Sequence, residues 1–362
     1  MRAALGLARR GLGRVWPNPA VGCVIVREGR VVGRGWTQPG GRPHAETEAL
    51  ARAGGQACGA TAYVTLEPCS HHGKTPPCAD ALVEAGLARV VMAHEDPDPR
   101  VAGRGAARLR AAGIEVVSGV LEAEARSLNA GFLSRVARGR PIVTLKLATS
   151  LDGRIATATG ESQWITGAEA RAQGHRLRAE HDAILIGIGT ALADDPSLTC
   201  RLPGMEPRSP VRVVLDSRLR LPRASRLASS GGPTWIVTRE GAESQWPQAN
   251  TSQRPEAGGV EVIGVRAGQD GRPDPLAVLE SLGGRGLTRV LLEGGGEAAA
   301  SFIRLGLVDV VVWFHAPLVL GGDGKAAVAA FGLDRLADSP IFTRSAVTGV
   351  GPDVMELYER AR

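Results

Sequence analysis

The chain has 362 residues, of which 43% are hydrophobic and 22% charged, and its formal net charge is +6. This length exceeds what one hydrophobic core usually holds, so we expect two folded domains, and the composition excludes a disordered chain. No apolar run approaches the roughly 20 residues that cross a bilayer, and the first residues lack the apolar core of a secretion signal. These features predict a cytoplasmic protein that has no membrane partner.

The net positive charge indicates an anionic partner. Basic residues are scattered along the chain and aromatic residues make up only 4%, which argues against a nucleic-acid surface and favours a small phosphorylated molecule. The five cysteines are an odd number and do not indicate a disulfide framework, which fits a reducing compartment. Only Cys69 and Cys78 lie in polar, turn-rich sequence.

The first part of the chain alternates strand and helix patterns. Segments 20–26 and 30–36 flank the turn pair Glu28-Gly29 and predict a β-hairpin. The elements expected next, in chain order, are a helix over 46–55, a strand over 60–66, a helix over 78–86, a strand over 88–93, a helix over 103–113, a strand over 114–120 and a helix over 122–137. This order is typical of a layered α/β domain.

The segment "RGRP" at 138–141 interrupts this pattern, and we place a domain boundary there. A second, strand-rich series follows, with strands expected over 141–150, 181–189, 210–216, 233–238, 288–296 and 308–317. Loops rich in proline and glycine separate these strands. The second part is therefore expected to be another α/β unit.

One histidine and two cysteines form a candidate metal site in the first part. His44 begins "HAE", and Cys69 and Cys78 flank the loop "SHHGKTPP". Catalytic zinc uses three protein ligands, and both cysteines lie where a helix start would favour the thiolate that binds metal. Taken singly, the histidine is as well explained by a surface position and the cysteines by packing. Together, the three residues are a candidate zinc-ligand set.

Glu46 adds a group that a purely structural metal site does not need. It stands two residues after His44, close enough to exchange protons with a metal-bound water. An H-x-E sequence followed by P-C and a second cysteine is the arrangement of zinc-dependent nucleobase deaminases. The chain departs from the usual C-x-x-C, because eight residues separate Cys69 from Cys78.

The motifs in both parts resemble one known family. "PNPAVGCVIV", "HAE", "TLEPCSHHGKTPPC" and "DPDPRVAGRG" resemble the deaminase half of the bifunctional riboflavin-biosynthesis deaminase-reductases. "KLATSLDGRIA", "GESQWITG", "LADDPSLT" and "LLEGGG" are similar to the reductase half. The resemblance covers essentially the whole chain. It implies a cytidine-deaminase-like α/β domain over 1–139 and a dihydrofolate-reductase-like domain over 140–362.

The resemblance also implies two successive reactions. The first is zinc-dependent hydrolytic deamination of 2,5-diamino-6-(5-phosphoribosylamino)pyrimidin-4(3H)-one. The second is reduction of the ribosyl group to ribityl by NADPH, giving 5-amino-6-(5-phosphoribitylamino)uracil. His44, Cys69 and Cys78 would hold zinc, Glu46 would carry protons, and Lys74 would meet the substrate phosphate. A solvated Lys74 is a second interpretation, and His71 and His72 are expected to shape the substrate site rather than bind metal.

In the reductase half, the resemblance assigns residues to cofactor and substrate. The cofactor set is Ala148, Trp164, Thr190, Asp194, Ser217, Gly295, Gly296, Glu297, Ala298, Ala299, Ala300 and Ser301. The substrate set is Ser162, Arg178, Leu198, Arg201 and Glu293. Glycines after a strand and before a helix leave N–H groups free for a cofactor phosphate, and the guanidinium forks of the two arginines suit a substrate phosphate. A leucine at 198 is equally explained by the core.

Lys146 and Asp194 are candidates for the proton movements that accompany opening of the ribosylamine ring, with a salt bridge as the alternative. "GIGTAL" at 187–192 contains only the first two glycines of G-x-G-x-x-G, so a Rossmann-type cofactor site is not expected. Lys325 in "GGDGKAA" is expected to be a loop residue.

Two other functions remain open at this point. A nucleic-acid editing deaminase of the tRNA type would share the zinc chemistry but would leave the second domain as an unexplained accessory. A non-catalytic zinc-stabilised binding module would have no use for Glu46 and would normally have four protein ligands. The sequence leaves open whether the chain forms a homo-oligomer.

Overall fold

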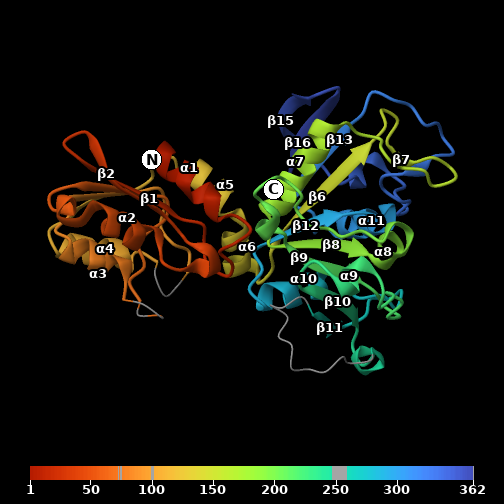
Figure 1. Cartoon of the computed structure of the whole chain (residues 1–362), viewed down its shortest axis with the longest axis horizontal. Coiled ribbons are helices and arrows are strands. Elements are labelled where there is room, and N and C mark those ends of the chain that lie inside the picture. Colours follow the sequence, from red (N-terminus) through yellow and green to blue (C-terminus); the bar gives the residue numbers. More distant parts are fainter. Residues whose placement is uncertain (72, 74–75, 99–101, 247–258, 362) are drawn as a thin grey trace. The chain divides into compact units, whose positions relative to one another are not determined.

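The structure, a computed structural model, describes residues 1–71, 73, 76–98, 102–246 and 259–361 (Figure 1). The chain divides into two compact units, Met1–Arg140 and Pro141–Arg362. The division falls within the segment 138–141, at which the sequence pattern changes. In the part of the chain that the structure describes, no helix is long and apolar enough to cross a membrane.

A five-stranded sheet in the order β2-β1-β3-β4-β5 forms the centre of the first unit. Its strands are β1 (Gly22–Arg27), β2 (Arg30–Trp36), β3 (Thr61–Val64), β4 (Arg89–Met92) and β5 (Glu115–Val117). β1 is antiparallel to β2 and β3, whereas β3, β4 and β5 are parallel. The predicted β1–β2 hairpin is confirmed. Glu28 and Gly29 have φ values of 51° and 74°, as a two-residue hairpin turn requires.

The helices of the first unit are α1 (Arg2–Ala8), α2 (Ala45–Ala53), α3 (Cys78–Glu84), α4 (Arg104–Ala111), α5 (Glu122–Leu128) and α6 (Ala130–Arg138). The single helix predicted over 122–137 was wrong, because Asn129 divides it. The Asn129 side chain accepts the N–H of Ala20 at 2.9 Å and donates to the Ala20 carbonyl at 3.1 Å. The strand predicted over 114–120 is also shorter, since only β5 forms there.

The core of the first unit lies between its sheet and its helices. Ile25 and Val64 of the strands are fully buried, as are Ala49 of α2 and Leu82 of α3. Small alanines let α2 approach the sheet closely. This close packing sets the position of the residues at the start of α2.

A nine-stranded sheet in the order β11-β10-β9-β8-β12-β6-β13-β16-β15 forms the second unit. Its strands are β6 (Ile142–Thr149), β8 (Ala183–Gly187), β9 (Val211–Leu215), β10 (Thr234–Arg239), β11 (Val260–Val265), β12 (Arg289–Glu293), β13 (Val310–His315), β15 (Phe342–Val350) and β16 (Asp353–Arg360). The strands from β11 to β13 are parallel. Near-continuous apolar runs such as "AILI" and "VRVVL" are typical of parallel strands that are covered on both faces.

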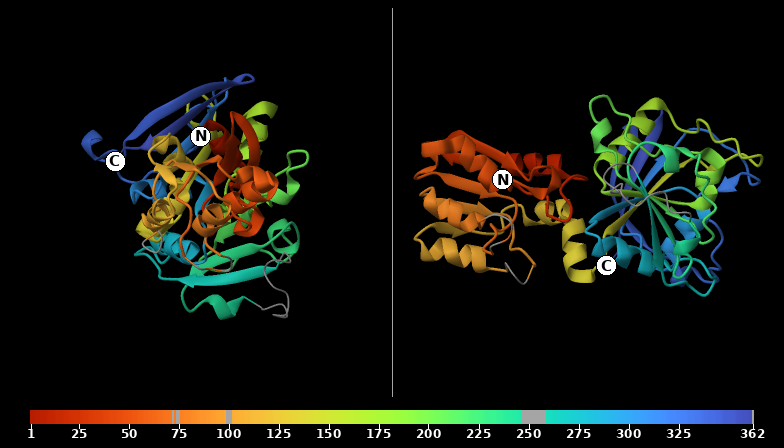
Figure 2. Two further views of the ribbon diagram at one scale, coloured as in Figure 1. Left: turned by 90° about the vertical axis from the view of Figure 1, so that its left-hand side faces the viewer. Right: turned by 60° about the horizontal axis from the view of Figure 1, so that its bottom comes forward.

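The strands β11, β15 and β16 were not among those predicted from the sequence. β15 and β16 form an antiparallel hairpin at the edge of the sheet, and Figure 2 shows it as a dark blue ribbon. Seven consecutive residues of β15 are exposed. An exposed strand has no alternation of apolar and polar residues to mark it in a sequence.

The helices of the second unit are α7 (Ala168–Ala179), α8 (Ile188–Asp194), α9 (Arg226–Ser229), α10 (Pro275–Gly284) and α11 (Gly296–Arg304). A small sheet pairs β7 (Arg154–Ala156) with β14 (Lys325–Ala326). Ile184, Val214 and Leu291 from three neighbouring strands are fully buried in the core. The loops that follow these strands all emerge at one edge of the sheet.

Candidate active sites

The three predicted metal ligands lie together in the first unit. His44 precedes α2, Cys69 lies in the loop after β3, and Cys78 is the first residue of α3. Their ligand atoms all lie within 4.8 Å of one another, with His44 Nδ1 at 3.3 Å from Cys78 Sγ and 3.6 Å from Cys69 Sγ. His71 lies outside this cluster. Both His72 and Lys74, a predicted substrate residue, fall outside the described residues.

The electrostatics of the cluster favour a metal cation. Hydrogen bonds from Cys78 and His44 lower the pKa of Cys69 to about 4, although burial opposes this shift. The Cys78 backbone N–H also donates to Cys69 Sγ, at 3.3 Å. The hydrogen bond with Cys69 and burial raise the pKa of Cys78. One nitrogen and two sulfur donors fit zinc with a fourth position open, and metal binding would require both cysteines to be thiolates.

Glu46 lies beside this cluster and is only 4% exposed. Burial raises the pKa of Glu46 to about 7, while the neighbouring His44 opposes that shift. A carboxyl group whose pKa is near neutral can both accept and donate a proton at physiological pH. Glu46 therefore has the properties of a general acid–base group.

Two glycines of β2 fix the distance between α2 and the sheet. A Cβ atom on Gly33 would overlap the carbonyl oxygen of Ala49, and a Cβ atom on Gly35 would overlap that of Ala45. The helix therefore lies directly on the backbone of the strand. This contact sets where His44 and Glu46, at the first turn of α2, stand relative to the cysteines.

The residues predicted for the reductase half gather at the carboxyl-terminal ends of the parallel strands of the second sheet. We call this end of the sheet the ligand edge, as distinct from the lateral edge formed by β15. β9, β8, β12 and β6 are adjacent and parallel, so the loops after their carboxyl ends meet. The predicted residues come from these ends: Lys146 and Ala148 from β6, Glu293 to Ser301 from the end of β12 and from α11, Thr190 and Asp194 from α8, and Ser217 from the loop after β9. Such an edge is where open α/β sheets bind ligands.

Three charged side chains interact at the ligand edge. Arg178 of α7 forms a two-pronged ion pair with Glu293, with Nε–Oε1 and Nη2–Oε2 distances of 2.8 Å. Lys146 stands opposite Glu293 in the pairing of β6 with β12. Burial alone would raise the pKa of Glu293, but Arg178 and then Lys146 lower it to about 2. Burial and the charge of Arg178 lower the pKa of Lys146, against the opposing effect of Glu293.

The glycine run after β12 has backbone geometry that few other residues adopt. Gly294 and Gly295 have φ values of 118° and 68°, and a Cβ atom on Gly294 would stand 3.0 Å from Thr190 Oγ1. Among the residues that the structure describes, no side chain caps the N–H groups at the start of α11. The predicted cofactor residue Thr190 thus lies beside the predicted cofactor loop, whose first N–H groups can receive a phosphate.

Four of the predicted residues differ in exposure: Trp164, Asp194, Ser162 and Leu198. Trp164 is 63% exposed, and the Arg171 guanidinium stacks over its ring, with Arg171 Cζ 4.7 Å from the centroid of the Trp164 ring. Asp194 is exposed and Ser162 is partly buried, and no described contact joins either of them to the Arg178–Glu293 pair. Leu198 is 4% exposed and has a φ of 53°.

His175 was missed by the sequence analysis. Its Nδ1 accepts the backbone N–H of Arg201 at 3.3 Å, while Arg178 Nη1 donates to the carbonyl of Thr199 at 3.1 Å. Burial and the charges of both arginines lower the pKa of His175. The spacing of His175 and Arg178, three residues apart on one helix, was the signal that could have indicated a shared face.

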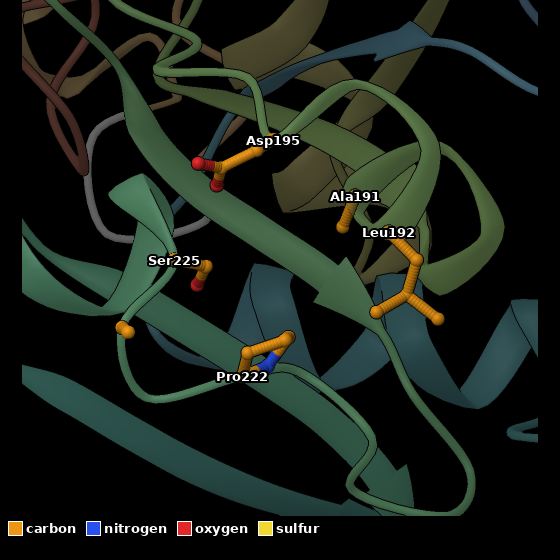
Figure 3. Close-up of a pocket in the computed structure, with 6 residues that line it drawn as sticks. Ala191, Leu192, Asp195, Pro222 and Ser225 are labelled. Carbon is orange, nitrogen blue, oxygen red and sulfur yellow. The ribbon is translucent and has the colours of Figure 1, made fainter.

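A pocket of about 260 Å³ opens beside α8, next to the residues predicted to bind cofactor (Figure 3). Its lining residues are Ala191, Leu192, Asp195, Pro222, Ala224 and Ser225. Asp195 Oδ1 accepts the backbone N–H of Arg226 at 2.8 Å, which ties the end of α8 to the start of α9. This pocket was not predicted from the sequence.

Two protein-family models match the chain. Residues 1–94 match the model "Cytidine and deoxycytidylate deaminase zinc-binding region", and residues 141–354 match the model "RibD C-terminal domain". The first match contains His44, Glu46, Cys69 and Cys78. The second contains every residue predicted for the reductase half.

Relatives of known name match over nearly the full chain. The Riboflavin biosynthesis protein RibD of Escherichia coli (strain K12) is 44% identical, over 98% of this chain and 96% of that protein. The protein of the same name from Bacillus amyloliquefaciens is 42% identical, over 98% of this chain and 94% of that protein.

Solved structures agree with this match. "Acinetobacter baumannii RibD, form 1" has a TM-score of 0.86 at 39% identity, covering 100% of this chain and 98% of that one. A diaminohydroxyphosphoribosylaminopyrimidine deaminase/5-amino-6-(5-phosphoribosylamino)uracil reductase from Thermotoga maritima has a TM-score of 0.86 at 36% identity, covering 100% and 97%. The chain therefore belongs to the RibD family of bifunctional deaminase-reductases of riboflavin biosynthesis.

Proposed function

We propose that the first unit deaminates 2,5-diamino-6-(5-phosphoribosylamino)pyrimidin-4(3H)-one and that the second unit then reduces its ribosyl group with NADPH. The observation that carries this proposal is the His44, Cys69 and Cys78 cluster with buried Glu46 beside it. It occurs in a chain whose other unit matches the RibD C-terminal domain. A nucleic-acid editing deaminase or a zinc-stabilised binding module would not account for that second unit.

In the deamination, Glu46 would act as the proton carrier. Zinc held by His44, Cys69 and Cys78 would supply a Lewis acid that makes water nucleophilic at neutral pH. Glu46 would take a proton from the attacking water and pass it to the pyrimidine, and the amino group would leave as ammonia. A carboxyl group with a pKa of about 7 suits both steps.

In the reduction, the chain's own residues would hold the substrate and provide a proton. Arg178 uses three of its five N–H groups in the described bonds to Glu293 and Thr199. We assign its two remaining N–H groups, together with Arg201 and Ser162, to the substrate phosphate. Lys146, whose pKa burial lowers, would donate the proton that opens the ribosylamine ring while NADPH supplies the hydride.

We further assign the cofactor to the edge formed by Thr190, the glycine run and α11. The uncapped N–H groups at the start of α11 would meet a cofactor phosphate. The proposed cofactor set also includes Ala148, Trp164, Asp194 and Ser217. Thr190 and Asp194 both belong to α8, the helix that also lines the 260 Å³ pocket.

The test is incubation of the purified chain with the pyrimidine nucleotide, with and without NADPH. We expect ammonia release in both cases, and loss of NADPH absorbance only after deamination. Parallel incubations with RNA and DNA oligonucleotides should release no ammonia. Deamination of an oligonucleotide in place of the free nucleotide would overturn the proposal.

A further inference from the structure

Glu67 is a buried carboxylate to which the proposed reactions assign no role. It lies in the loop after β3, two residues before Cys69, and is 3% exposed. Its Oε2 accepts the backbone N–H groups of Asp96 at 3.1 Å and Gly103 at 2.9 Å, and its Oε1 accepts that of Ala106 at 3.0 Å. Hydrogen bonds to a charged acceptor are about twice as strong as neutral ones.

These three donors belong to one stretch of chain, which we call the wall segment (residues 94–98 and 102–106). Two further contacts bring it against the loop of Cys69. The Glu67 backbone N–H donates to the carbonyl of His94 at 3.0 Å, and a Cβ atom on Gly105 would overlap the carbonyl oxygen of Pro68. The wall segment and the loop therefore touch backbone to backbone, with the Glu67 carboxylate between them.

The wall segment lies beside the loop that carries the metal ligand Cys69. Asp96, whose backbone N–H donates to Glu67 Oε2 at 3.1 Å, is 7% exposed. Asp96 Oδ1 also accepts the backbone N–H of Asp98 at 2.9 Å. Glu67 therefore holds Asp96 and the rest of the wall segment against the loop of Cys69.

We propose that Glu67 is a positioning residue of the deaminase site, which sets the wall segment at a fixed distance from the loop that carries Cys69. The proposal rests on the deamination proposed above. In this role Glu67 binds neither metal nor substrate. It determines whether the wall segment is already in place against the loop of Cys69 when the substrate arrives, so it acts on substrate binding more than on the chemical step.

The test uses Glu67→Gln in the full chain. The substituted amide has one acceptor oxygen, so an NH₂ group would face at least one of the three N–H donors. Asp182→Asn is the matched control, because Asp182 Oδ2 likewise accepts the N–H groups of Thr288 and Arg289 at 2.6 and 2.9 Å, but in the second unit. Glu67→Asp is a second variant, which keeps the charge and shortens the side chain by one methylene.

We expect Glu67→Gln to keep its zinc, to raise the KM for the pyrimidine nucleotide about tenfold and to change kcat by less than about threefold. Amide hydrogen exchange at Gly103 and Ala106 should become faster than in the wild type. Asp182→Asn should leave the deaminase KM unchanged. An unchanged KM in zinc-loaded Glu67→Gln, with only a lower melting temperature, would reduce Glu67 to a fold-stabilising residue and overturn the proposal.

Loss of zinc from both Glu67 variants would also overturn it, because the carboxylate would then support the ligands rather than the wall. A wild-type chain that releases no ammonia would contradict the proposed deamination instead. In that case unchanged amide exchange at Gly103 and Ala106 would still reject the Glu67 contact, and faster exchange would still support it.

Discussion

Both oxygens of the Glu293 carboxylate accept hydrogen bonds from the Arg178 guanidinium, at 2.8 Å each. The two residues are 115 positions apart in the sequence, and their side chains are only 10% and 15% exposed. A nearly buried pair of this kind ties the end of β12 to α7, so its protonation affects the stability of the second unit.

We expect Glu293→Gln to destabilise the second unit by about 3 kcal/mol near pH 7, because Arg178 loses its charged partner. The folded-state pKa of Glu293, about 2, lies below its ordinary value of 4.5. The carboxylate therefore stabilises the fold above pH 4.5, and this contribution is lost as the pH falls toward 2. Calorimetry should show a melting temperature roughly 6–12 °C lower near neutral pH, and a smaller difference at about pH 3.

Glu180→Gln is the control for this prediction. Glu180 pairs with Arg176 on the exposed face of α7, where an ion pair contributes little. Its melting temperature should stay close to that of the wild type at both pH values. A Glu293→Gln difference that did not shrink in acid would show that the ion pair is not its source.

Replacing Glu46 by glutamine should abolish deamination while zinc stays bound. The ligand atoms belong to His44, Cys69 and Cys78, whereas Glu46 would supply proton transfer, which contributes about 10²–10⁴-fold to such reactions. Elemental analysis and an ammonia assay check the two parts. Glu48→Gln is the matched control, because Glu48 lies one half-turn further along α2 and pairs with Arg52 on the surface. Normal turnover by Glu46→Gln would remove the proton-carrier role.

Gly295→Val should weaken NADPH binding by at least about tenfold, since loss of one or more charge-assisted hydrogen bonds costs roughly 1.5–3 kcal/mol each. Gly295 has a φ of 68° with Thr190 Oγ1 close by, so a β-branched residue would force the loop to shift. Deamination in the other unit should continue. Gly284→Val serves as the control, because nothing lies within 4 Å of its Cβ position. NADPH fluorescence titration measures the affinity, and an unchanged value in Gly295→Val would remove the loop from the cofactor site.

A fragment of residues 1–140 should fold and deaminate without NADPH, and a fragment of residues 141–362 should reduce the deaminated nucleotide. The reason is that each unit has its own sheet and its own buried cluster. Circular dichroism, zinc content and the two activity assays check the fragments. If the first fragment were folded and zinc-loaded yet inactive, the second unit would have to contribute to the first site.

Much of the architecture could be predicted from the sequence because its signals are local. Apolar runs marked the parallel strands of the second sheet other than β11, and paired turn residues marked the β1–β2 hairpin. The elements that were missed depend on distant contacts or on exposure. Asn129 reads as an ordinary helix residue until its two bonds to Ala20, 109 positions away, divide the helix. The β15 strand is exposed over seven residues and so lacks the alternation that a buried face imposes.

The candidate sites show the same division. His44, Glu46, Cys69 and Cys78 could be proposed because their spacing carries the chemistry. No spacing along the chain indicates that Glu293 pairs with Arg178. The same is true of the hydrogen bond between His175 and the backbone of Arg201. A guanidinium that the sequence predicts to bind a phosphate has part of its hydrogen-bonding capacity taken by a carboxylate.

The contact of α2 with the backbone of β2 has a consequence for how this protein tolerates mutation. Gly33 and Gly35 contain no reactive group, yet any side chain there would collide with the carbonyls of Ala49 and Ala45 and push the helix away. His44 and Glu46 lie at the first turn of that helix and would move with it. In a library of random variants, substitutions at positions 33 and 35 should therefore abolish deamination nearly as completely as substitutions at the metal ligands. Selection for activity in such a library should therefore retain Gly33 and Gly35, which support the helix, as well as the catalytic residues that the helix carries.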